Sequence, residues 1–505
     1  MSSFDHLMSG FAVALTWKSL LYCFIGCFWG TIVGVLPGLG PLAGMVLLLP
    51  LTFGLDPATG IIMLTGIFYG AMYGGSTTSI LVRIPGEAAS VVTCIDGYEM
   101  ARQGRAGPAL MIAAVGSFIG GTVSVLGLML VTPPLSRVML QIGPQVEVVL
   151  MLMALCTIAF ISGGSRLKTA SMIVLGLAVG TIGLDKLTGE PRFTFGNLGL
   201  ADGLSFTALA IGLFGISEIL LNLEKSETIK AIRPRLKDLV PRWSDLKESA
   251  PAIGRGTIVG FIFGIVPGVS HVVSTFVSYA IEKRFSKHPE EFGKGAIAGV
   301  AGPETANNAT TGTAMIPLLG LGIPSIPATA ILLSALTIHG VTPGPLLLTE
   351  HPEVFWGLVA SMYVGNAVLL ILNLPFVGVF VNLLRIPYGW LVPTILVISV
   401  IGVYSVNSNA ADIWIMAISG GIGYLLRKFG YDLAPVALGL VLAPMLELSL
   451  RQSLAMSAGD YTIFVTRPIS VTMLGMGLVL LALSLKPAFT RGKDWREKVG
   501  LRDEG

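Results

Sequence analysis

The sequence predicts an all-α integral membrane protein with roughly 12 transmembrane helices, some of them broken or re-entrant, and two internal repeats. The 505 residues are 53% hydrophobic and only 12% charged, whereas soluble domains carry about 25% charge. The mean hydropathy is +0.80. Glycine is abundant, with 63 residues, and small residues let membrane helices pack with their backbones in contact.

Apolar stretches divide the chain into candidate spans, several of them shorter than the ~17 residues that a full crossing needs. In the first half they are residues 19–36, 41–55, 57–73, 109–131, 146–161, 169–184 and 204–221. In the second half they are residues 253–266, 272–281, a long broken region 295–348, 354–384, 390–406, 413–426, 433–448 and 469–485.

The repeats are predicted from a glycine ladder that occurs twice, with Gly26 and Gly256 230 positions apart. The first ladder is Gly26, Gly30, Gly34 and Gly38, and the second is Gly256, Gly260, Gly264 and Gly268. A spacing of four places these glycines on one stripe of a helix. Both ladders end in a Pro-Gly break, and duplicated broken helices are typical of transporters that bind their solute near the breaks.

Basic segments suggest how the chain is divided and oriented. Residues 224–249 hold seven Lys/Arg and five Asp/Glu, and the tail after Leu485 is also rich in basic residues. Basic loops favour the cytoplasm. We therefore expect a first transmembrane repeat at 1–222, a cytoplasmic basic linker at 223–250, a second repeat with additional helices at 251–485, and a cytoplasmic tail at 486–505. We take the repeat as inverted if residues 41–55 cross the membrane, and as parallel if they do not.

Small and polar residues gather at related places in the two halves, and Thr77-Thr78 and Thr310-Thr311 match at an offset of 233. We predict that substrate and coupling cation bind at Gly74, Gly75, Ser76, Thr77, Thr78, Ser79, Glu304, Asn307, Asn308, Thr310 and Thr311. We predict helix breaks at Pro37, Gly38, Pro85, Gly86, Pro267, Gly268 and Pro324.

The physical basis of this prediction is the cost of irregular backbone at membrane depth, which needs burial in protein or contact with a cavity. A broken helix leaves N–H groups that suit an anion at one stump and carbonyls that suit Na⁺ at the other. Hydroxyls and amides add neutral ligands. The alternative is that Gly/Ser/Thr runs serve only close helix packing.

Glu304 is the most informative charge, because residues 295–348 contain no other acid and no Lys or Arg. A lone carboxylate at membrane depth is costly and usually functional. Three roles are open: a proton carrier, a cation ligand, or a cap for the N–H groups of a helix stump. Arg83 and Glu87 flank Pro85-Gly86, and an arginine there either binds a substrate carboxylate or extends to the membrane edge.

Other function classes find no support in the sequence. The net charge of +3 is too small to indicate nucleic acid as a partner. The four cysteines resemble apolar packing residues, and no metal site beyond Na⁺ is expected. No catalytic constellation, phosphate-binding loop or cofactor motif is found, so we expect neither an enzyme nor an ATP-driven pump. No signal peptide of the usual form precedes the first span.

Several motifs together resemble the TctA family, the large membrane subunit of tripartite tricarboxylate transporters. They are Gly34-Val35-Leu36-Pro37-Gly38-Leu39-Gly40, Leu49-Pro50-Leu51-Thr52-Phe53, residues 73–81, Ile84-Pro85-Gly86-Glu87, residues 302–309 and Leu321-Gly322-Ile323-Pro324. The resemblance covers nearly the whole chain.

The resemblance implies a secondary transporter that imports di- or tricarboxylates such as citrate and is coupled to Na⁺ or H⁺. It also implies two partners in a bacterial inner membrane system: a small membrane subunit (TctB-like) and a periplasmic solute-binding protein (TctC-like). The alternative is a passive channel or exporter of small solutes that works without a binding protein. The sequence selects neither the carboxylate nor the coupling ion.

Overall fold

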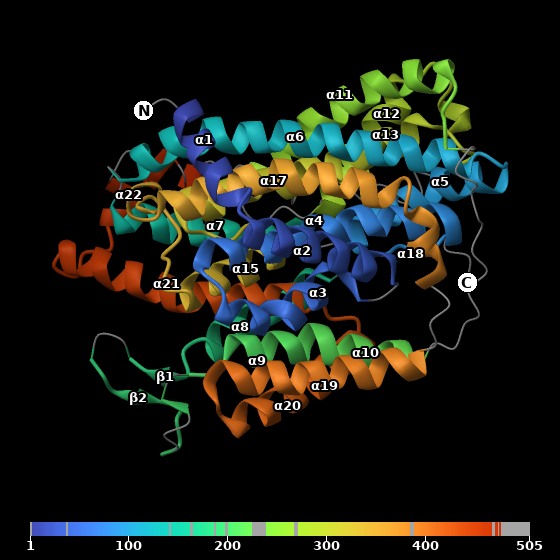
Figure 1. The fold of residues 1–505 in the computed structure, drawn as a ribbon. Coiled ribbons are helices and arrows are strands. Elements are labelled where there is room, and N and C mark those ends of the chain that lie inside the picture. The colour runs from blue at the N-terminus through green and yellow to red at the C-terminus, as the bar shows by residue number, and fades with distance from the viewer. Residues whose placement is uncertain are drawn as a thin grey trace.

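The structure is a computed structural model. It describes residues 3–36, 39–140, 143–161, 165–185, 188–196, 200–201, 203–224, 239–266, 271–383, 388–466, 470–472 and 474–475. The predicted all-α membrane class is confirmed at this level, because helices dominate and the described residues form a single sheet of two short strands. Figure 1 shows the helices packed side by side with their axes along roughly one direction.

The elements follow one another along the chain with short connections. In the first half they are α1 (Ser3–Ala14), α2 (Trp17–Val35), α3 (Gly40–Leu48), η1 (Leu49–Gly54), α4 (Pro57–Val82), η2 (Ala88–Val91), α5 (Thr93–Arg102), α6 (Ala106–Met139), α7 (Pro144–Ile161), α8 (Arg166–Val179), β1 (Gly183–Leu184), β2 (Pro191–Arg192), α9 (Phe206–Ala210), η4 (Ile211–Ile216) and α10 (Ser217–Leu223). In the second half they are α11 (Trp243–Ile265), α12 (His271–Phe285), η6 (Pro289–Glu291), α13 (Ala298–Thr313), α14 (Met315–Leu321), α15 (Pro327–Ile338), α16 (Leu347–Glu350), α17 (Pro352–Asn373), α18 (Val377–Leu383), α19 (Tyr388–Asn407), α20 (Ala410–Lys428), α21 (Ala434–Met456) and α22 (Ile463–Thr466).

Five helices in the described part of the chain are long and apolar enough to cross a membrane, judged by length and composition. They are Trp17–Val35, Ala106–Met139, Phe206–Leu223, Pro352–Asn373 and Ala434–Met456. Shorter apolar helices accompany them, among them Gly40–Gly54 and Pro327–Ile338. One predicted span is wrong in its extent, because residues 354–384 form α17 and α18 with a break after Asn373.

The first glycine ladder holds α2 against α4 in backbone contact. A Cβ built on Gly26 would overlap the carbonyl oxygen of Met63, and one built on Gly30 would overlap that of Ile67. Any side chain at these positions would push the two helices apart. The contacts rise together along both helices, so α2 and α4 run in the same direction.

The second ladder makes the same kind of contact between α11 and α13. A Cβ on Gly256 would overlap the carbonyl oxygen of Gly302, and one on Gly260 would overlap that of Ala306. Here too the two helices run in the same direction. Each half of the chain therefore contains a glycine-striped helix packed in parallel on the helix that carries the predicted polar residues.

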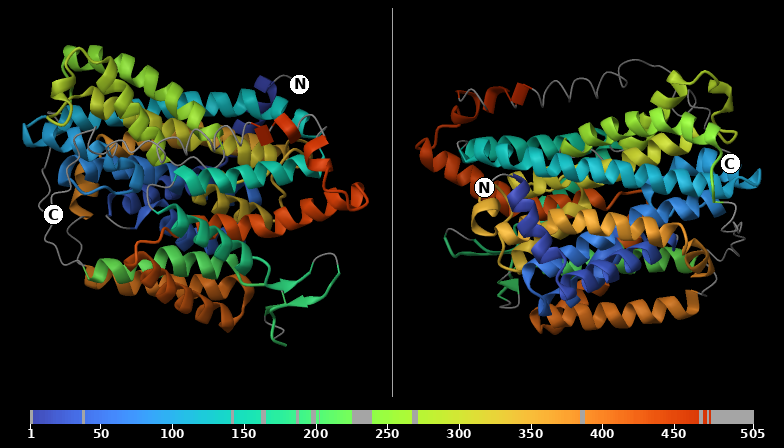
Figure 2. Two further views of the ribbon diagram at one scale, coloured as in Figure 1. Left: turned by 180° about the vertical axis from the view of Figure 1, so that it is seen from behind. Right: turned by 45° about the horizontal axis from the view of Figure 1, so that its top comes forward.

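The two polar helices α4 and α13 lie against each other and run in opposite directions. Ser76, near the C-terminal end of α4, donates a hydrogen bond to Glu304 in the first half of α13. The hydroxyl of Tyr69, two turns earlier in α4, lies 2.8 Å from the place where a Cβ on Gly312 would be. Figure 2 shows these central helices enclosed by the rest of the bundle.

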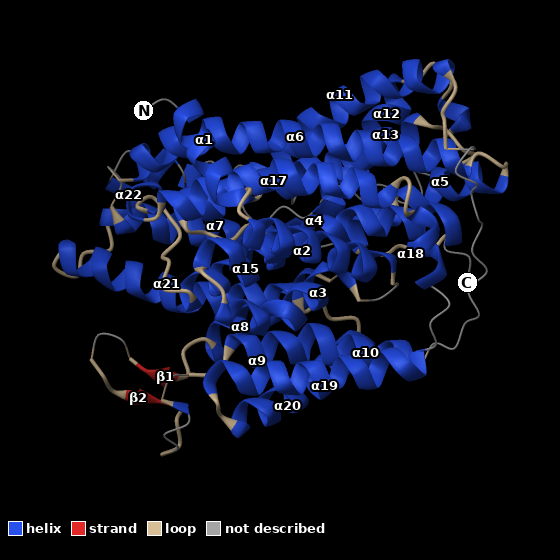
Figure 3. Ribbon diagram, viewed as in Figure 1, coloured by secondary structure: helices blue, strands red, loops and turns tan. Residues whose placement is uncertain are grey.

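The two ends of the bundle differ in chemistry. At one end, which we call the basic end, Arg105 before α6 pairs with Asp245 of α11 at 2.7 Å, and Gln103 donates to the carbonyl of Lys294 at 2.7 Å. The opposite end, which we call the hairpin end, carries the antiparallel pair β1–β2 with Gly183 opposite Arg192. Figure 3 shows this hairpin outside the helical body, far from α5.

Candidate functional site

The predicted break at residues 74–79 is wrong, because α4 continues as a helix to Val82. The hydroxyls in this stretch donate to backbone carbonyls. Ser79 donates to Gly75 at 3.0 Å, and Thr78 donates to Val35 of α2 at 2.9 Å. Because each hydroxyl finds an acceptor on the helix backbone, the polar residues are buried without breaking the helix. Thr77 is also buried in α4.

The second polar segment is likewise part of an unbroken helix, α13, although the sequence predicts a broken region there. Thr310 donates to the carbonyl of Ala306 at 2.8 Å, and Thr311 donates to that of Asn307 at 2.9 Å. Their hydroxyls are thus bonded within the helix, four residues back.

The predicted register between the halves is also corrected by the packing. Gly34 of the first ladder faces the backbone of Ala71, and Gly264 of the second faces that of Thr310. Ala71 in α4 is therefore the structural counterpart of Thr310 in α13. Matching the two Thr-Thr pairs at an offset of 233 displaces the helices by more than one turn, because it aligns similar residues instead of equivalent contacts.

One break lies just after α4 and folds back onto the ladder. Arg83 ends α4 in the left-handed region with φ of 62°, and Pro85 and Gly86 lie between α4 and η2. A Cβ on Gly86 would overlap the carbonyl oxygen of Gly34, and would lie 2.6 Å from the Cα of Gly75. Only glycine permits so close an approach, which holds the following residue, Glu87, over α4.

The other described break follows α14. Gly322 ends that helix with φ of 73°, and Pro324 lies in the connection to α15. The Thr329 hydroxyl accepts from the backbone N–H groups of Ser325 and Ile326, at 3.0 and 3.1 Å. The predicted breaks at Pro37, Gly38, Pro267 and Gly268 lie outside the described residues.

Glu304 is buried at the meeting point of three elements, with 1% of its surface exposed. One carboxylate oxygen accepts from Ser76 of α4 and the other from Thr93 at the start of α5. Glu304 lies in the interior of α13, and both donors are side-chain hydroxyls. The capping role considered for this residue is therefore wrong.

A second carboxylate, Glu87, performs the capping role nearby. Its Oε2 accepts from the N–H of Ala89 at 2.6 Å, and its own N–H donates to Ser90 at 3.3 Å, which forms a capping box for η2. The other oxygen, Oε1, accepts from Asn307 Nδ2 at 3.1 Å. Asn307 lies one turn after Glu304, so the two carboxylates share one polar cluster.

This cluster holds more acceptors than donors. The Oδ1 atoms of Asn307 and Asn308 are both buried and have no hydrogen-bond partner among the described residues. Asn308 Nδ2 donates to Ser117 of α6 at 2.7 Å. In the hydrogen bonds and ion pairs recorded for the described chain, no Lys or Arg pairs with Glu87 or Glu304. Two uncompensated carboxylates beside unpaired amide oxygens form an electronegative, buried site.

The ligand chemistry of this cluster suits a hard cation or a proton. Its atoms are carboxylate, amide and hydroxyl oxygens, which are the ligands that hard cations prefer. The described residues contain no group of three or more His, Cys, Asp or Glu side chains arranged for a metal ion. The chemistry therefore favours an alkali cation or a proton over a transition metal.

Sequence reasoning missed several side chains of the site. Thr93 and Ser117 occur in stretches with no distinguishing pattern, and only folding brings them to α13. His271 of α12 was also missed, and its Nε2 lies 3.1 Å from the Thr311 hydroxyl. For Glu87 a signal existed, because Ser90 follows three positions later, as in a capping box. Arg83 is exposed, and its guanidinium lies over the ring of Tyr98 at 5.9 Å, away from Glu304.

These contacts separate binding residues from packing residues, and one substitution tests the division. Thr78→Val removes the hydroxyl that bonds to Val35 and keeps the shape of the side chain. We expect it to cost about 1 kcal/mol of stability and to leave the half-saturation constants for solute and cation unchanged. Thermal unfolding and uptake kinetics measure the two effects.

The matched comparison is Ser76→Ala, which removes a hydroxyl that bonds to Glu304 one half-turn earlier in the same helix. We expect this variant to change the cation dependence of uptake. Equal changes in cation or solute affinity for both variants would make Thr78 a ligand and contradict the division.

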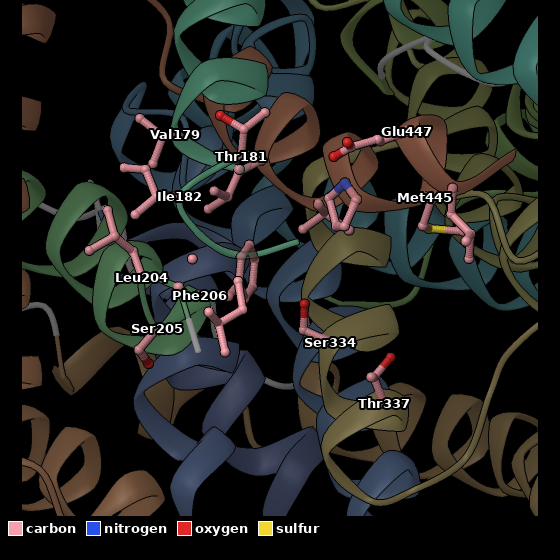
Figure 4. A pocket seen from close by; sticks show the side chains of 18 of the residues that line it. Val179, Thr181, Ile182, Leu204, Ser205, Phe206, Ser334, Thr337, Met445 and Glu447 are labelled. Atoms are coloured by element: carbon pink, nitrogen blue, oxygen red, sulfur yellow. The ribbon is translucent and has the colours of Figure 1, made fainter. Parts of the chain in front are cut away.

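The largest cavity described in this chain lies elsewhere. It has a volume of about 1100 Å³ and is lined by α8, α9, α15, α21 and the hairpin (Figure 4). None of the sequence-predicted binding residues lines it. Gly60 of α4 lies near His339, just beyond α15, and from Gly60 to Ser76 the helix rises about 24 Å. The cavity and the Glu304 cluster therefore lie toward opposite ends of the bundle.

Known proteins resemble this chain over most of its length. A family model described as "Tripartite tricarboxylate transporter TctA family" matches residues 20–438. An Agrobacterium vitis protein described as "Uncharacterized 52.8 kDa protein in TAR-I ttuC' 3'region" is 47% identical over 494 residues, which is 98% of each chain. Another, described as "Uncharacterized protein in TAR-II ttuC' 3'region", is 48% identical over 235 residues, 46% of this chain and 97% of that protein.

No solved structure matches the chain. The family match agrees with the apolar helices, and it includes both glycine ladders, Glu87 and residues 302–309. The chain therefore belongs to the tripartite tricarboxylate transporter TctA family.

Proposed function

We propose that this chain is the large permease subunit of a binding-protein-dependent secondary transporter, which imports di- or tricarboxylates of the citrate type together with Na⁺ or H⁺. The family and the apolar helices support a membrane transporter. The observation that carries the coupling is Glu304, a buried carboxylate bonded to two hydroxyls and to no base among the described contacts.

In this proposal the coupling cation binds between α4 and α13. Glu304 and Glu87 supply negative charge, and the unpaired Oδ1 atoms of Asn307 and Asn308 supply neutral ligands. Ser76 orients the Glu304 carboxylate. The glycines Gly74 and Gly75 allow close approach of α2 and of the Pro85–Gly86 break. A cation bound here neutralises the cluster, which lowers the cost of moving it or reshaping it during transport.

We further propose that the chain consists of two inverted repeats, which alternate access to the site. What supports this is that α2 and α4 run parallel, α11 and α13 run parallel, and α4 lies antiparallel to α13. Related helix pairs with opposite directions are the arrangement of inverted-repeat transporters. The repeats would comprise residues 1–222 and 251–485. The proposed linker lies partly outside the described residues, at 225–238, and the proposed tail at 486–505 lies wholly outside them.

The partners follow from the tripartite description of the family. We propose a small membrane subunit and a secreted solute-binding protein, with the whole assembly in a bacterial inner membrane. The positive-inside rule places the basic end in the cytoplasm. The hairpin end then faces the compartment where the binding protein delivers the solute.

Reconstitution tests the proposal. Proteoliposomes that contain both membrane subunits, with binding protein outside, should accumulate labelled citrate or another di- or tricarboxylate when a Na⁺ or pH gradient is imposed. Imposing the two gradients separately identifies the coupling ion. Liposomes without the binding protein are the control.

Two outcomes contradict the proposal in different ways. Flux that neither saturates nor depends on the binding protein would favour the alternative, a passive channel or exporter. If a broad carboxylate panel shows no gradient-dependent uptake, the assignment of substrate class is wrong.

A further inference from the structure

The large cavity at the hairpin end has polar walls and two arginines. Hydroxyls of Ser205, Thr207, Ser334 and Thr337 line it. Figure 4 shows Ser334 and Thr337 on one wall, Leu204 and Ser205 on another, and Glu447 above them. At about 1100 Å³ it exceeds the ~300–1,000 Å³ of typical small-molecule pockets, so a citrate-sized anion fits with water around it.

Four charged side chains form a closed ring at this cavity. Arg192 of β2 pairs with Asp185 at 2.8 Å and with Glu447 of α21 at 3.0 Å. Arg451, one turn after Glu447, pairs with the same two carboxylates at 2.9 and 2.7 Å. Each carboxylate therefore bridges both arginines, and the ring fastens the hairpin to α21.

The arginines retain capacity for a further acceptor. Arg192 Nε is buried and has no hydrogen-bond partner among the described residues. The hydrogen bonds to Glu447 and the nearby Asp185 raise the pKa of Arg192, so its guanidinium stays charged. Two guanidiniums bridged by two separate carboxylates present the spacing that a molecule with two carboxylates of its own requires.

We propose that this cavity is an outer solute site, in which the carboxylates of an arriving di- or tricarboxylate replace Asp185 and Glu447 on Arg192 and Arg451. This inference rests on the proposed function for the identity of the solute. Replacing one carboxylate by another on the same guanidinium exchanges bonds of similar strength, so the ring opens at low cost only for a solute that engages both arginines.

The charges of the cavity explain why exchange is required. Its acids are Asp185, Asp412 and Glu447, against the two arginines, so a closed ring does not attract an anion. A monocarboxylate would release one bridge and leave the other acid on its arginine. A di- or tricarboxylate replaces both bridges and releases the hairpin from α21, which couples arrival of the solute to opening of this end.

Binding to the purified full-length chain in lipid nanodiscs tests the inference without requiring transport. Citrate, succinate and propionate are titrated calorimetrically into wild type, Arg451→Gln and Glu447→Gln. We expect citrate and succinate to bind wild type and propionate not to bind. Arg451→Gln should weaken binding about tenfold, because a charge-assisted bond is lost. Glu447→Gln should strengthen binding, because a competing carboxylate is removed.

The opposite signs distinguish a solute site from a purely structural latch. Both substitutions break the same ring, so a latch alone would shift both variants in the same direction or in neither. That result would overturn the inference, and so would failure of wild type to bind any of the three probes. Arg102→Gln, which breaks an exposed pair with Glu99 at the basic end, is the control and should bind as wild type does.

The same preparation separates this inference from the proposed function. Binding with the expected signs, but without gradient-driven uptake in proteoliposomes, would support the outer site and contradict the transport mechanism. Uptake that is normal in Arg451→Gln, with unchanged citrate affinity, would leave the transporter proposal intact and remove the outer site. Monodispersity and helical content of each variant confirm that it is folded.

Discussion

Glu304→Gln is expected to lower cation-driven uptake by about 100-fold or more, the equivalent of losing a buried charge worth about 3 kcal/mol. The amide keeps the size of the side chain, and the hydroxyls of Ser76 and Thr93 serve as acceptors as well as donors. The cluster therefore remains bonded while its charge is lost. Initial uptake rates in proteoliposomes, with Na⁺ and pH gradients imposed in turn, measure the effect.

The control is Glu290→Gln, which removes an exposed carboxylate of η6 and should leave uptake unchanged. Thermal unfolding of the Glu304→Gln protein should stay close to that of wild type, which separates loss of coupling from loss of folding. If the variant keeps full cation-dependent uptake, Glu304 is not the coupling residue.

Gly260→Ala is expected to destabilise the protein by about 1–3 kcal/mol, the usual cost of overpacking a tight contact. The added methyl would overlap the carbonyl oxygen of Ala306, which belongs to the backbone of α13 and cannot rotate away. Helices α11 and α13 must then separate, and α13 carries Glu304. We expect a lower thermal unfolding temperature together with reduced uptake.

Gly254→Ala is the matched control on the same helix. No atom lies within 4 Å of a Cβ built there, and alanine has a higher helix propensity than glycine by about 1 kcal/mol. This variant should be as stable as wild type or more so. If Gly254→Ala and Gly260→Ala unfold at the same temperature, the ladder contact does not stabilise the fold.

The ladder was predictable because its signal is local. Glycine at every fourth position defines a stripe on any helix, so a close helix contact followed without knowledge of the partner. The partner was not predictable, because nothing near Gly256 or Gly260 in sequence names Gly302 or Ala306. The predicted membrane class also needed only local composition, since burial in lipid demands long apolar segments.

Helix continuity through residues 74–79 and 304–311 was predicted wrongly for an identifiable reason. Glycine, serine and threonine weaken helices in water, and that preference suggested breaks. In the buried bundle, Ser79 and Thr310 donate to carbonyls four residues earlier, so the helical form satisfies their hydroxyls. The break moved to Pro85, which cannot donate a backbone hydrogen bond.

The candidate site was predictable in part. Glu304 stood out because it is the only charge in a long apolar region, and this reasoning needs no tertiary contact. Its role as a bridge between α4 and α5 depends on Ser76 and Thr93, which are more than 200 positions away.

By itself, the sequence determined what each segment costs to bury: apolar helices, glycine stripes, one deep carboxylate and a family membership. Only the tertiary structure decided which segments meet. It placed Glu87 beside the Glu304 cluster through Asn307, and it closed the ring of Arg192 and Arg451 at the other end. The physical reason is that burial costs depend on local composition, whereas the partner that offsets each cost is supplied from a distant part of the chain.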